Sequence, residues 1–302
     1  MLNPKVREVQ VRAPAKINLI LKVLGRLPNG YHELWSIMQT VDLFDHVSLR
    51  TTSSSQGIQL ICPSSRVPQG PDNIVYRAAA LVLKKADIHD GVEISLEKQI
   101  PMGAGLGGGS SDAAATIFGL VQLFQLRWSW PEMTELGAEL GSDVPFFFYG
   151  PQALIRGWGQ DVTPMTITGS RWILLVNPGF SIETGWAYQQ IAQSRTQIPR
   201  LSAEFQALQQ REALDFQDLL PHIENDFEPA LFPARHRLNE IKDELCSLGA
   251  DVALLSGSGS TVFGVFSEEH AAVKASEQMR RDPHMQVFCV PTSSSTLALI
   301  QN

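Results

Sequence analysis

The chain has 302 residues, which is enough for two domains of about 150 residues each. Hydrophobic residues make up 44% of it and charged residues 18%, so a large core can be buried and a disordered chain is excluded. The net charge of -7, without a cluster of Lys or Arg, gives nucleic acid no electrostatic reason to bind. No apolar run reaches the roughly 18 residues that a membrane span needs.

The three cysteines are far apart in the sequence, at Cys62, Cys246 and Cys289. They match neither a disulfide framework nor a zinc motif, which favours a reducing, cytoplasmic location. The histidines show no metal-ligand spacing, so no protein metal site is expected. We expect a monomer or a weak homodimer without nucleic-acid or membrane partners.

Strands and helices are mixed along the first half of the chain. Residues 9–24 are apolar and β-branched and place alternate side chains on one face, which predicts a strand that ends at an Asn29-Gly30 turn. Residues 92–100 alternate in the same way. The other elements expected here are a strand over 34–49 and helices over 73–85, 111–126 and 131–140.

A stretch rich in Gly, Pro and Thr, at residues 150–170, separates two predicted domains, 1–160 and 161–302. In the second domain, residues 254–266 read as a strand that small residues interrupt at 256–261. The other elements expected there are a strand over 172–176 and helices over 202–214, 233–248 and 270–280. The expected fold class is therefore mixed, α+β and α/β.

A glycine-rich loop joins a predicted strand to a predicted helix and reads PMGAGLGGGSSD over residues 101–112. Glycine allows φ > 0 and lets a ligand approach without a Cβ in the way. Because a helix follows, the N–H groups of the loop gather at the positive end of the helix dipole, which makes a cradle for polyphosphate. Ser110 and Ser111 can cap this helix or offer hydroxyls to phosphate or Mg²⁺. The alternative is a tight turn without a ligand.

The neighbourhood of the loop excludes three familiar phosphate-binding motifs. A dinucleotide fingerprint needs an acidic residue at the end of a second strand about 20 positions on, and residues 126–130 read LRWSW instead. A Walker A loop needs a lysine after its glycines, and none follows here. The signatures of a protein kinase are also missing.

Three segments together resemble the GHMP kinases, which include galactokinase and the homoserine, mevalonate and phosphomevalonate kinases. They are APAKINLIL at 13–21, PMGAGLGGGSSDAAA at 101–115 and LLSGSGSTVF at 254–263, in the order and spacing of the family. Within the family, GRLPNGYHEL at 25–34 and GSDVPFF at 141–147 resemble the members that phosphorylate the 2-hydroxyl of a cytidine-diphosphate-linked methylerythritol.

The resemblance implies a two-domain GHMP kinase fold with the active site in the interdomain cleft, and Mg²⁺ and ATP as cofactors. ATP would be held in the N-terminal domain, and a cytidine diphosphate substrate would lie on the other side of the cleft. The residues implied to bind ATP are Pro101, Gly103, Ala104, Gly105, Leu106, Gly107, Gly108, Gly109, Ser110, Ser111, Asn73 and Lys98. Without the resemblance, their positions favour a helix cap for Asn73 and a charge at a strand edge for Lys98.

Asp143 is the candidate general base. It lies in a turn of small residues before an apolar run, where a carboxylate is partly desolvated and can take the proton of an alcohol. Lys16 and Asn18 are two positions apart on a strand and hence share a face. Lys16 can hold Asp143 ionised and offset charge on the transferring phosphoryl group. The alternatives are a helix-capping Asp143 and a Lys16 that reaches water.

Tyr31 and His32 follow the predicted turn and offer a flat ring and a hydrogen-bonding edge, which suits a pyrimidine base. The alternative is ordinary packing at a hairpin. The resemblance adds Thr184 and Tyr188, the latter as a second aromatic ring on the base, and Asn18 as a substrate contact. The rival functions are another GHMP kinase with a different acceptor, a non-catalytic nucleotide-binding protein on the same scaffold and, more remotely, a dehydrogenase.

Overall fold

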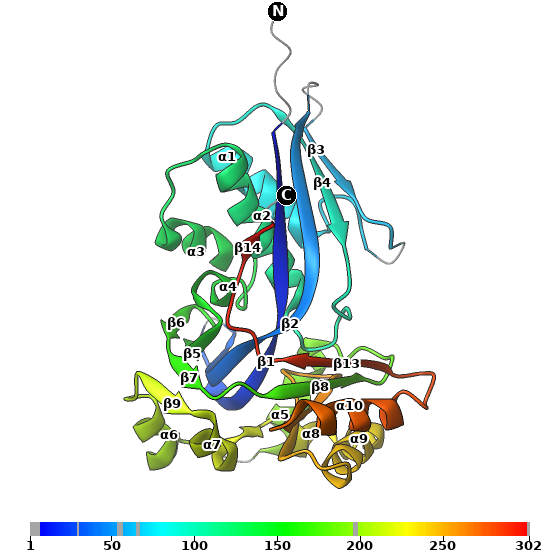
Figure 1. Cartoon of the computed structure of the whole chain (residues 1–302). Coiled ribbons are helices and arrows are strands. Elements are labelled where there is room, and N and C mark those ends of the chain that lie inside the picture. The colour runs from blue at the N-terminus through cyan, green and yellow to red at the C-terminus, as the bar shows by residue number, and fades with distance from the viewer. Residues whose placement is uncertain (1–6, 29, 53–56, 65–66, 196–198, 301–302) are drawn as a thin grey trace, which may run out of the picture.

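Two long antiparallel strands, β1 (Glu8–Arg26) and β2 (His32–Thr52), form the spine of the protein (Figure 1). The computed structural model describes residues 7–28, 30–52, 57–64, 67–195 and 199–300. The strands pair from Glu8 opposite Arg50 to Arg26 opposite His32, with three register shifts on the way. At their joined end, the N–H of Leu27 donates to the carbonyl of Tyr31 at 2.7 Å. Asn29, predicted in this turn, lies outside the described residues.

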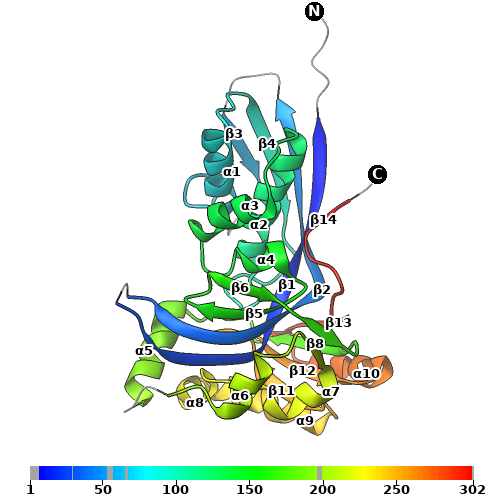
Figure 2. The ribbon, with the colours of Figure 1, turned by 90° about the vertical axis from the view of Figure 1, so that its left-hand side faces the viewer.

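β1 and β2 belong to a mixed eight-stranded sheet. α-Helices cover one face of the sheet in its upper part as drawn in Figures 1 and 2. Its buried core includes Val11, Leu49 and Ile94 from the strands and Ala114 and Ile117 from α2. The further strands are β3 (Ile58–Ile61), β4 (Gly91–Glu97), β5 (Gln152–Gly157) and β6 (Asp161–Pro164), and the helices are α1 (Ile74–Lys85), α2 (Gly108–Leu123), α3 (Trp130–Ala138) and α4 (Phe146–Tyr149).

A second sheet has the strand order β11-β12-β8-β13. Because side chains alternate along β8, Ile173 and Leu175 pack against the lower parts of β1 and β2, while Leu174 and Val176 pack against helices. These strands are β8 (Trp172–Asn177), β11 (Val252–Leu255), β12 (Val262–Phe266) and β13 (Gln286–Pro291). The helices of this part are α5 (Thr184–Ser194), α8 (Glu228–Leu231), α9 (His236–Ser247) and α10 (Glu269–Met279).

Two short strands from the C-terminal half of the chain join the first sheet. β10 (Glu224–Asn225) pairs in parallel with Ile20 and Leu21 of β1, and β14 (Ala298–Leu299) pairs antiparallel with Val11 and Arg12. The chain therefore crosses between the two sheets several times. The predicted boundary at residues 160 and 161 stays a prediction. None of the helices in the described part of the chain combines the length and the apolar character that crossing a bilayer takes.

The helix predicted over residues 202–214 is wrong beyond its first half. α6 (Ala203–Leu208) begins with Ser202 as its cap and ends at Leu208, and β9 (Ala213–Asp215) then pairs with β7 (Thr166–Thr168). The polar run at 209–212 offers no apolar side chain to continue the helix, whereas Leu214 gains a place in the core as part of a strand. Asp215 next caps α7 (Phe216–Leu219), and a 3-10 turn, η1 (Leu220–His222), follows.

We predict that Gly119→Ala destabilises the protein, by about 1–3 kcal/mol, because α2 lies too close to the sheet for a side chain here. A Cβ at Gly119 would lie 2.4 Å from Cδ1 of Leu49 and 3.1 Å from Cγ2 of Val11. Gly109→Ala, on the same helix, is the matched control, since its Cβ would meet nothing nearer than 3.8 Å. Chemical denaturation of both variants checks this. Equal stabilities would contradict the packing of α2 on β1 and β2.

Candidate active site

One large cavity, of about 1100 Å³, brings the predicted site residues together. Its walls come from β1, the loop before α2, the segment before α4, and the start of α5. The predicted residues that line it are Lys16, Asn18, Tyr31, His32, Asn73, Lys98, Pro101, Gly103, Ala104, Gly105, Leu106, Gly107, Gly108, Gly109, Ser110, Asp143, Thr184 and Tyr188. Ser111 is the exception, because it is buried beneath the loop.

The glycine loop has a backbone that only glycine adopts easily. Gly103, Gly105 and Gly107 have φ values of 61°, 77° and 69°. A Cβ at Gly105 would lie 2.0 Å from the carbonyl oxygen of Ser256, and one at Gly107 would lie 2.8 Å from Cγ of Lys16. The loop leads into the first turn of α2, whose N–H groups have no partners inside the helix and face the end where an anion is stabilised. These residues fit the phosphates of ATP.

The serines of the loop do not cap α2, contrary to the prediction. α2 begins at Gly108, three residues earlier than expected, and its cap is Gly107, which has no side chain to donate or accept. Ser110 and Ser111 therefore lie inside the first turn. Ser111 is fully buried, and its hydroxyl has no hydrogen-bond partner among the described residues. A buried hydroxyl without a partner is costly, which fits an oxygen ligand for a phosphate or for its Mg²⁺.

The candidate catalytic pair lies beside this loop. Nζ of Lys16 forms an ion pair with Oδ2 of Asp143 at 3.4 Å and donates to Oδ1 of Asn18 at 2.7 Å. Nδ2 of Asn18 donates in turn to Ser36, whose hydroxyl donates to the carbonyl of Ile20 at 2.6 Å. The side chain of Lys16 is only 4% exposed and that of Asp143 is 30% exposed. The ammonium is thus fixed from one side, and the carboxylate remains accessible from the cavity.

Aromatic rings form the other end of the cavity. The rings of His32 and Tyr188 stack at 4.2 Å with an angle of 10° between their planes. Tyr31 lies against Trp158 at 5.2 Å, and Phe227 meets the edge of Tyr188 at 5.0 Å. The sequence analysis missed Trp158 and Phe227. Trp158 lies between Gly157 and Gly159, a pattern typical of a turn that exposes a large ring, and this pattern could have indicated it.

Two titrating groups at this end are shifted by their surroundings. Burial and the positive charge of Arg26 lower the pKa of His32, so its ring is neutral at pH 7 and can both donate and accept. Burial and the carboxylate of Asp143 raise the pKa of the Tyr188 hydroxyl, which keeps it protonated. The rings at this end of the cavity are therefore uncharged, with the charges of Arg26 and Asp143 near them.

Asn73 and Lys98 make the structural contacts that were the alternatives to nucleotide binding, and both also line the cavity. Asn73 caps α1, since its side chain accepts from the N–H of Val75 at 2.8 Å. Lys98 is held between the carboxylates of Asp45 and Asp112, the second at 2.6 Å. Asp45 also accepts from the N–H groups of residues 99 and 100. Asp45 was not predicted as a partner of Lys98, because the two residues lie 53 positions apart.

Two carboxyl groups, those of Asp45 and Asp112, share the ammonium of Lys98. Burial shifts the pKa of Asp112 most clearly. Burial raises the pKa of Asp112 to about 8, against the opposing effect of Lys98. Asp45 has the two backbone donors as well as Lys98, whereas Oδ1 of Asp112 has no partner among the described residues. Asp112 is therefore the carboxyl that keeps its proton at neutral pH.

We predict that Asp112→Asn flattens the pH dependence of stability. The folded protein holds a proton on Asp112 up to about pH 8, while the unfolded chain releases it near pH 4, so the free energy of unfolding falls as pH rises between these values. The slope from one proton is at most about 1.4 kcal/mol per pH unit, and the variant lacks it. Urea denaturation of both proteins from pH 5 to pH 8 measures the difference. Parallel curves would show that Asp112 is ionised when folded.

Comparison with known proteins agrees with this geometry. The model of the GHMP kinases N terminal domain matches residues 73–151, and that of the GHMP kinases C terminal domain matches residues 205–284. The 4-diphosphocytidyl-2-C-methyl-D-erythritol kinase of Citrifermentans bemidjiense is 41% identical over 280 residues, which are 91% of this chain and 96% of that protein. The protein of the same name from Geobacter sulfurreducens is 40% identical over 279 residues, with the same coverage of 91% and 96%.

Solved structures are similar over nearly the whole chain. A crystal structure of 4-(cytidine 5'-diphospho)-2C-methyl-D-erythritol kinase has a TM-score of 0.76 and 32% identity, over 94% of this chain and all of that one. Homoserine kinase from Cytophaga hutchinsonii has a TM-score of 0.72 at 20% identity, over 99% of both chains, and shows the fold alone. The two-domain fold, the family models and the relatives agree: the chain is a kinase that belongs to the GHMP kinase family.

Proposed function

We propose that this kinase transfers the γ-phosphate of ATP to the 2-hydroxyl of 4-diphosphocytidyl-2-C-methyl-D-erythritol, giving the 2-phosphate and ADP in the non-mevalonate synthesis of isoprenoid precursors. The observation that carries the proposal is one cavity with a glycine loop and a Lys16–Asp143 ion pair at one end and neutral aromatic rings at the other. The names of the relatives support the choice of acceptor. We expect the enzyme to act in the cytoplasm.

Asp143 would act as the general base. The acceptor hydroxyl must lose a proton as its oxygen bonds to phosphorus, and a carboxylate that is partly open to the cavity can accept it. Lys16 holds the side chain of Asp143 in an ion pair at 3.4 Å, so the base is in position before the substrate binds. No covalent intermediate is needed, because the hydroxyl can attack in line from the side of Asp143.

Lys16 would also stabilise the charge on the transferring group. Its only carboxylate partner among the described residues is the half-open Asp143, and its other partner is the neutral amide of Asn18. Much of its positive charge therefore remains for phosphoryl oxygens. Mg²⁺, when bound with ATP, would neutralise the phosphates further, and the hydroxyl of Ser110, which lines the cavity, is an oxygen ligand that this chain offers near them.

The aromatic end would hold the cytosine. A pyrimidine ring gains by stacking on Tyr31 and Tyr188, and a neutral His32 can hydrogen-bond with its edge. Thr184, at the start of α5, lines the cavity and lies within 3.3 Å of the hydroxyl of Ser258. It is placed to contact the part of the substrate between the base and the reacting hydroxyl. Galactose, mevalonate and homoserine have no aromatic base that would stack on these rings and hydrogen-bond with His32.

We predict that the enzyme releases ADP from Mg²⁺–ATP with the cytidyl acceptor but not with mevalonate, homoserine or galactose. Asp143→Asn should lower kcat by roughly 10²–10⁴-fold, because it removes the base. Asp42→Asn, the same change on an exposed position of β2, is the control. Turnover on another acceptor would support a kinase activity but contradict the proposed cytosine site. Near-normal turnover of Asp143→Asn would reject the base.

We also predict that Tyr188→Leu raises KM for the cytidyl acceptor by about tenfold or more, the scale of one lost stacking contact. KM for ATP should stay within about twofold, since the ring of Tyr188 packs on His32 and Phe227 and not on the glycine loop. Tyr188→Phe keeps the ring and is the matched control. The same pair of changes at Tyr31 tests the other ring. An unchanged acceptor KM after loss of both rings would remove them from the cytosine site.

A further inference from the structure

Residues 224–227, Glu-Asn-Asp-Phe, lie where three parts of the cavity wall are joined. β10 contributes the first two of them, and it pairs with β1 beside Ile20 and Leu21. Phe227 lines the cavity, whereas Asn225 and Asp226 are buried behind it, at 4% and 9% exposure. Neither polar side chain is among the described residues that line the cavity, so direct contact with substrate does not explain them.

Asn225 holds the turn that leads from β11 to β12. Its Nδ2 donates to the carbonyls of Leu255 and Gly257, at 2.7 Å and 2.8 Å, and its Oδ1 accepts from the N–H of Phe227 at 2.9 Å. Both Nδ2 and Oδ1 of Asn225 therefore bind backbone groups. An aspartate in its place would set a negative oxygen against two carbonyl oxygens.

The turn held by Asn225 rests on the glycine loop. The hydroxyl of Ser256 donates to the carbonyl of Gly105 at 3.0 Å, and the N–H of Thr261 donates to the carbonyl of Ala104 at 3.1 Å. A Cβ at Gly105 would lie 2.0 Å from the carbonyl oxygen of Ser256, so there is no space for a side chain between the two backbones. A shift of the turn would therefore shift the backbone that fits the phosphates of ATP.

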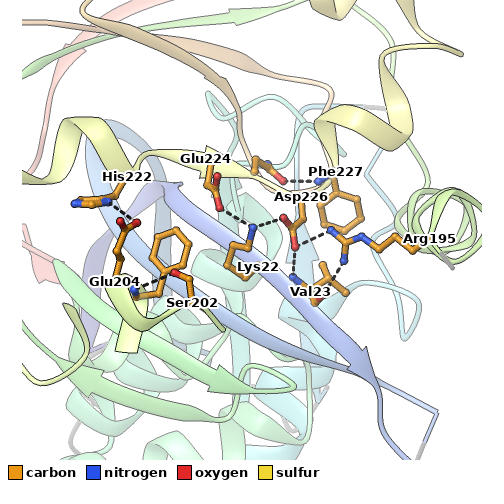
Figure 3. Close-up of polar contacts among 11 residues, drawn as sticks. Lys22, Val23, Arg195, Ser202, Glu204, His222, Glu224, Asp226 and Phe227 are labelled. Carbon is orange, nitrogen blue, oxygen red and sulfur yellow. Dashed lines mark hydrogen bonds and ion pairs between the residues drawn. The ribbon is translucent and has the colours of Figure 1, made fainter. Parts of the chain in front are cut away.

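Asp226 holds the end of α5 instead (Figure 3). Its Oδ2 accepts from the N–H of Val23 and pairs with Nη2 of Arg195, both at 2.8 Å. Its Oδ1 pairs with Nζ of Lys22 at 2.6 Å, and Nη1 of Arg195 donates to the carbonyl of Val23 at 2.7 Å. Arg195 directly follows the last residue of α5, so this carboxylate ties α5 to β1.

The charge balance makes Asp226 the centre of this group. Two cations converge on it, and Glu224, the second carboxylate near Lys22, is 49% exposed. Burial alone would lower the pKa of Lys22, but the hydrogen bonds with Asp226 and Glu224 raise it, so Lys22 stays charged. Loss of the Asp226 carboxylate would leave the Arg195 guanidinium without its buried partner, and α5 would lose its link to β1.

α5 carries Thr184 and Tyr188, and the stack of Tyr188 on His32 bridges α5 and β2. We infer that Asn225 and Asp226 are positioning residues for different halves of the site. Asn225 sets the glycine loop, and thereby the affinity for ATP; Asp226 sets α5, and thereby the affinity for the acceptor. The part of the inference that concerns Asp226 rests on the proposed function, because the acceptor is part of that proposal.

Two isosteric variants test the inference through KM. Asn225→Asp should raise KM for ATP by about tenfold and leave the acceptor KM within about twofold, a change on the scale of one or two lost hydrogen bonds. Asp226→Asn should do the reverse, and Arg195→Gln, which removes only the tie to α5, should reproduce it. Glu224→Gln, the exposed neighbour, is the control and should change neither KM. Thermal unfolding of each variant shows whether it is folded.

A rise of both KM values in parallel, in both variants, would overturn the inference and leave 224–227 a purely structural segment. Unchanged KM values with a lower melting temperature would overturn it as well. Acceptor KM is measured with whichever acceptor the wild type turns over, and ATP binding is also measured by calorimetry without acceptor. A wild type inactive on the cytidyl acceptor would thus reject the proposed function, while the crossed pattern of the two variants would still decide the inference.

Discussion

The arrangement of the site depends on the direct contact of two backbones from opposite halves of the chain. The glycine loop and the turn at 256–261 touch without side chains between them, and the hydrogen bond from Ser256 to Gly105 joins residues 151 positions apart. This contact fixes the loop before any ligand binds, so little entropy is lost when phosphates enter. It also relates the loop to β11 and β12, and through Asn225 to β1. Both ends of the cavity are therefore built on one frame.

Three lysines near this frame, Lys16, Lys22 and Lys98, have different electrostatic surroundings, which favours a different role for each. Lys98 lies between two carboxyl groups, and Lys22 also has two carboxylate partners, so the charge of each is balanced inside the protein. Lys16 has one half-open carboxylate and a neutral amide. An ammonium that the protein itself neutralises can do little for a phosphoryl group, whereas Lys16 keeps its charge in a site of low dielectric constant. The lysine predicted from its apolar neighbours is the one whose charge remains available.

Local patterns predicted much of this structure. The strand at 9–24, the helix at 73–85 and the glycine loop each follow from residues that are near one another in the sequence, and the structure has all three. Asp45, Asn225 and Asp226 were missed because their partners are far away along the chain, such as Val23, 203 positions from Asp226. The start of α2 was misplaced, since glycine is a poor helix former and only tertiary packing makes Gly108 and Gly109 helical.

The middle of β1 shows why a buried polar network is retained here. Both faces of the strand are covered, one side by the helices of the first sheet and the other by the second sheet, so Lys16 and Asn18 are almost fully buried and reach only the cavity. Buried polar groups are tolerated when each has a partner, and the chain from Lys16 through Asn18 and Ser36 to the carbonyl of Ile20 meets that condition. The same chain gives Lys16 one position beside Asp143. The hydrogen bonds that stabilise the buried ammonium of Lys16 therefore also hold it in place for the proposed chemistry. It does not have to reorganise during the reaction.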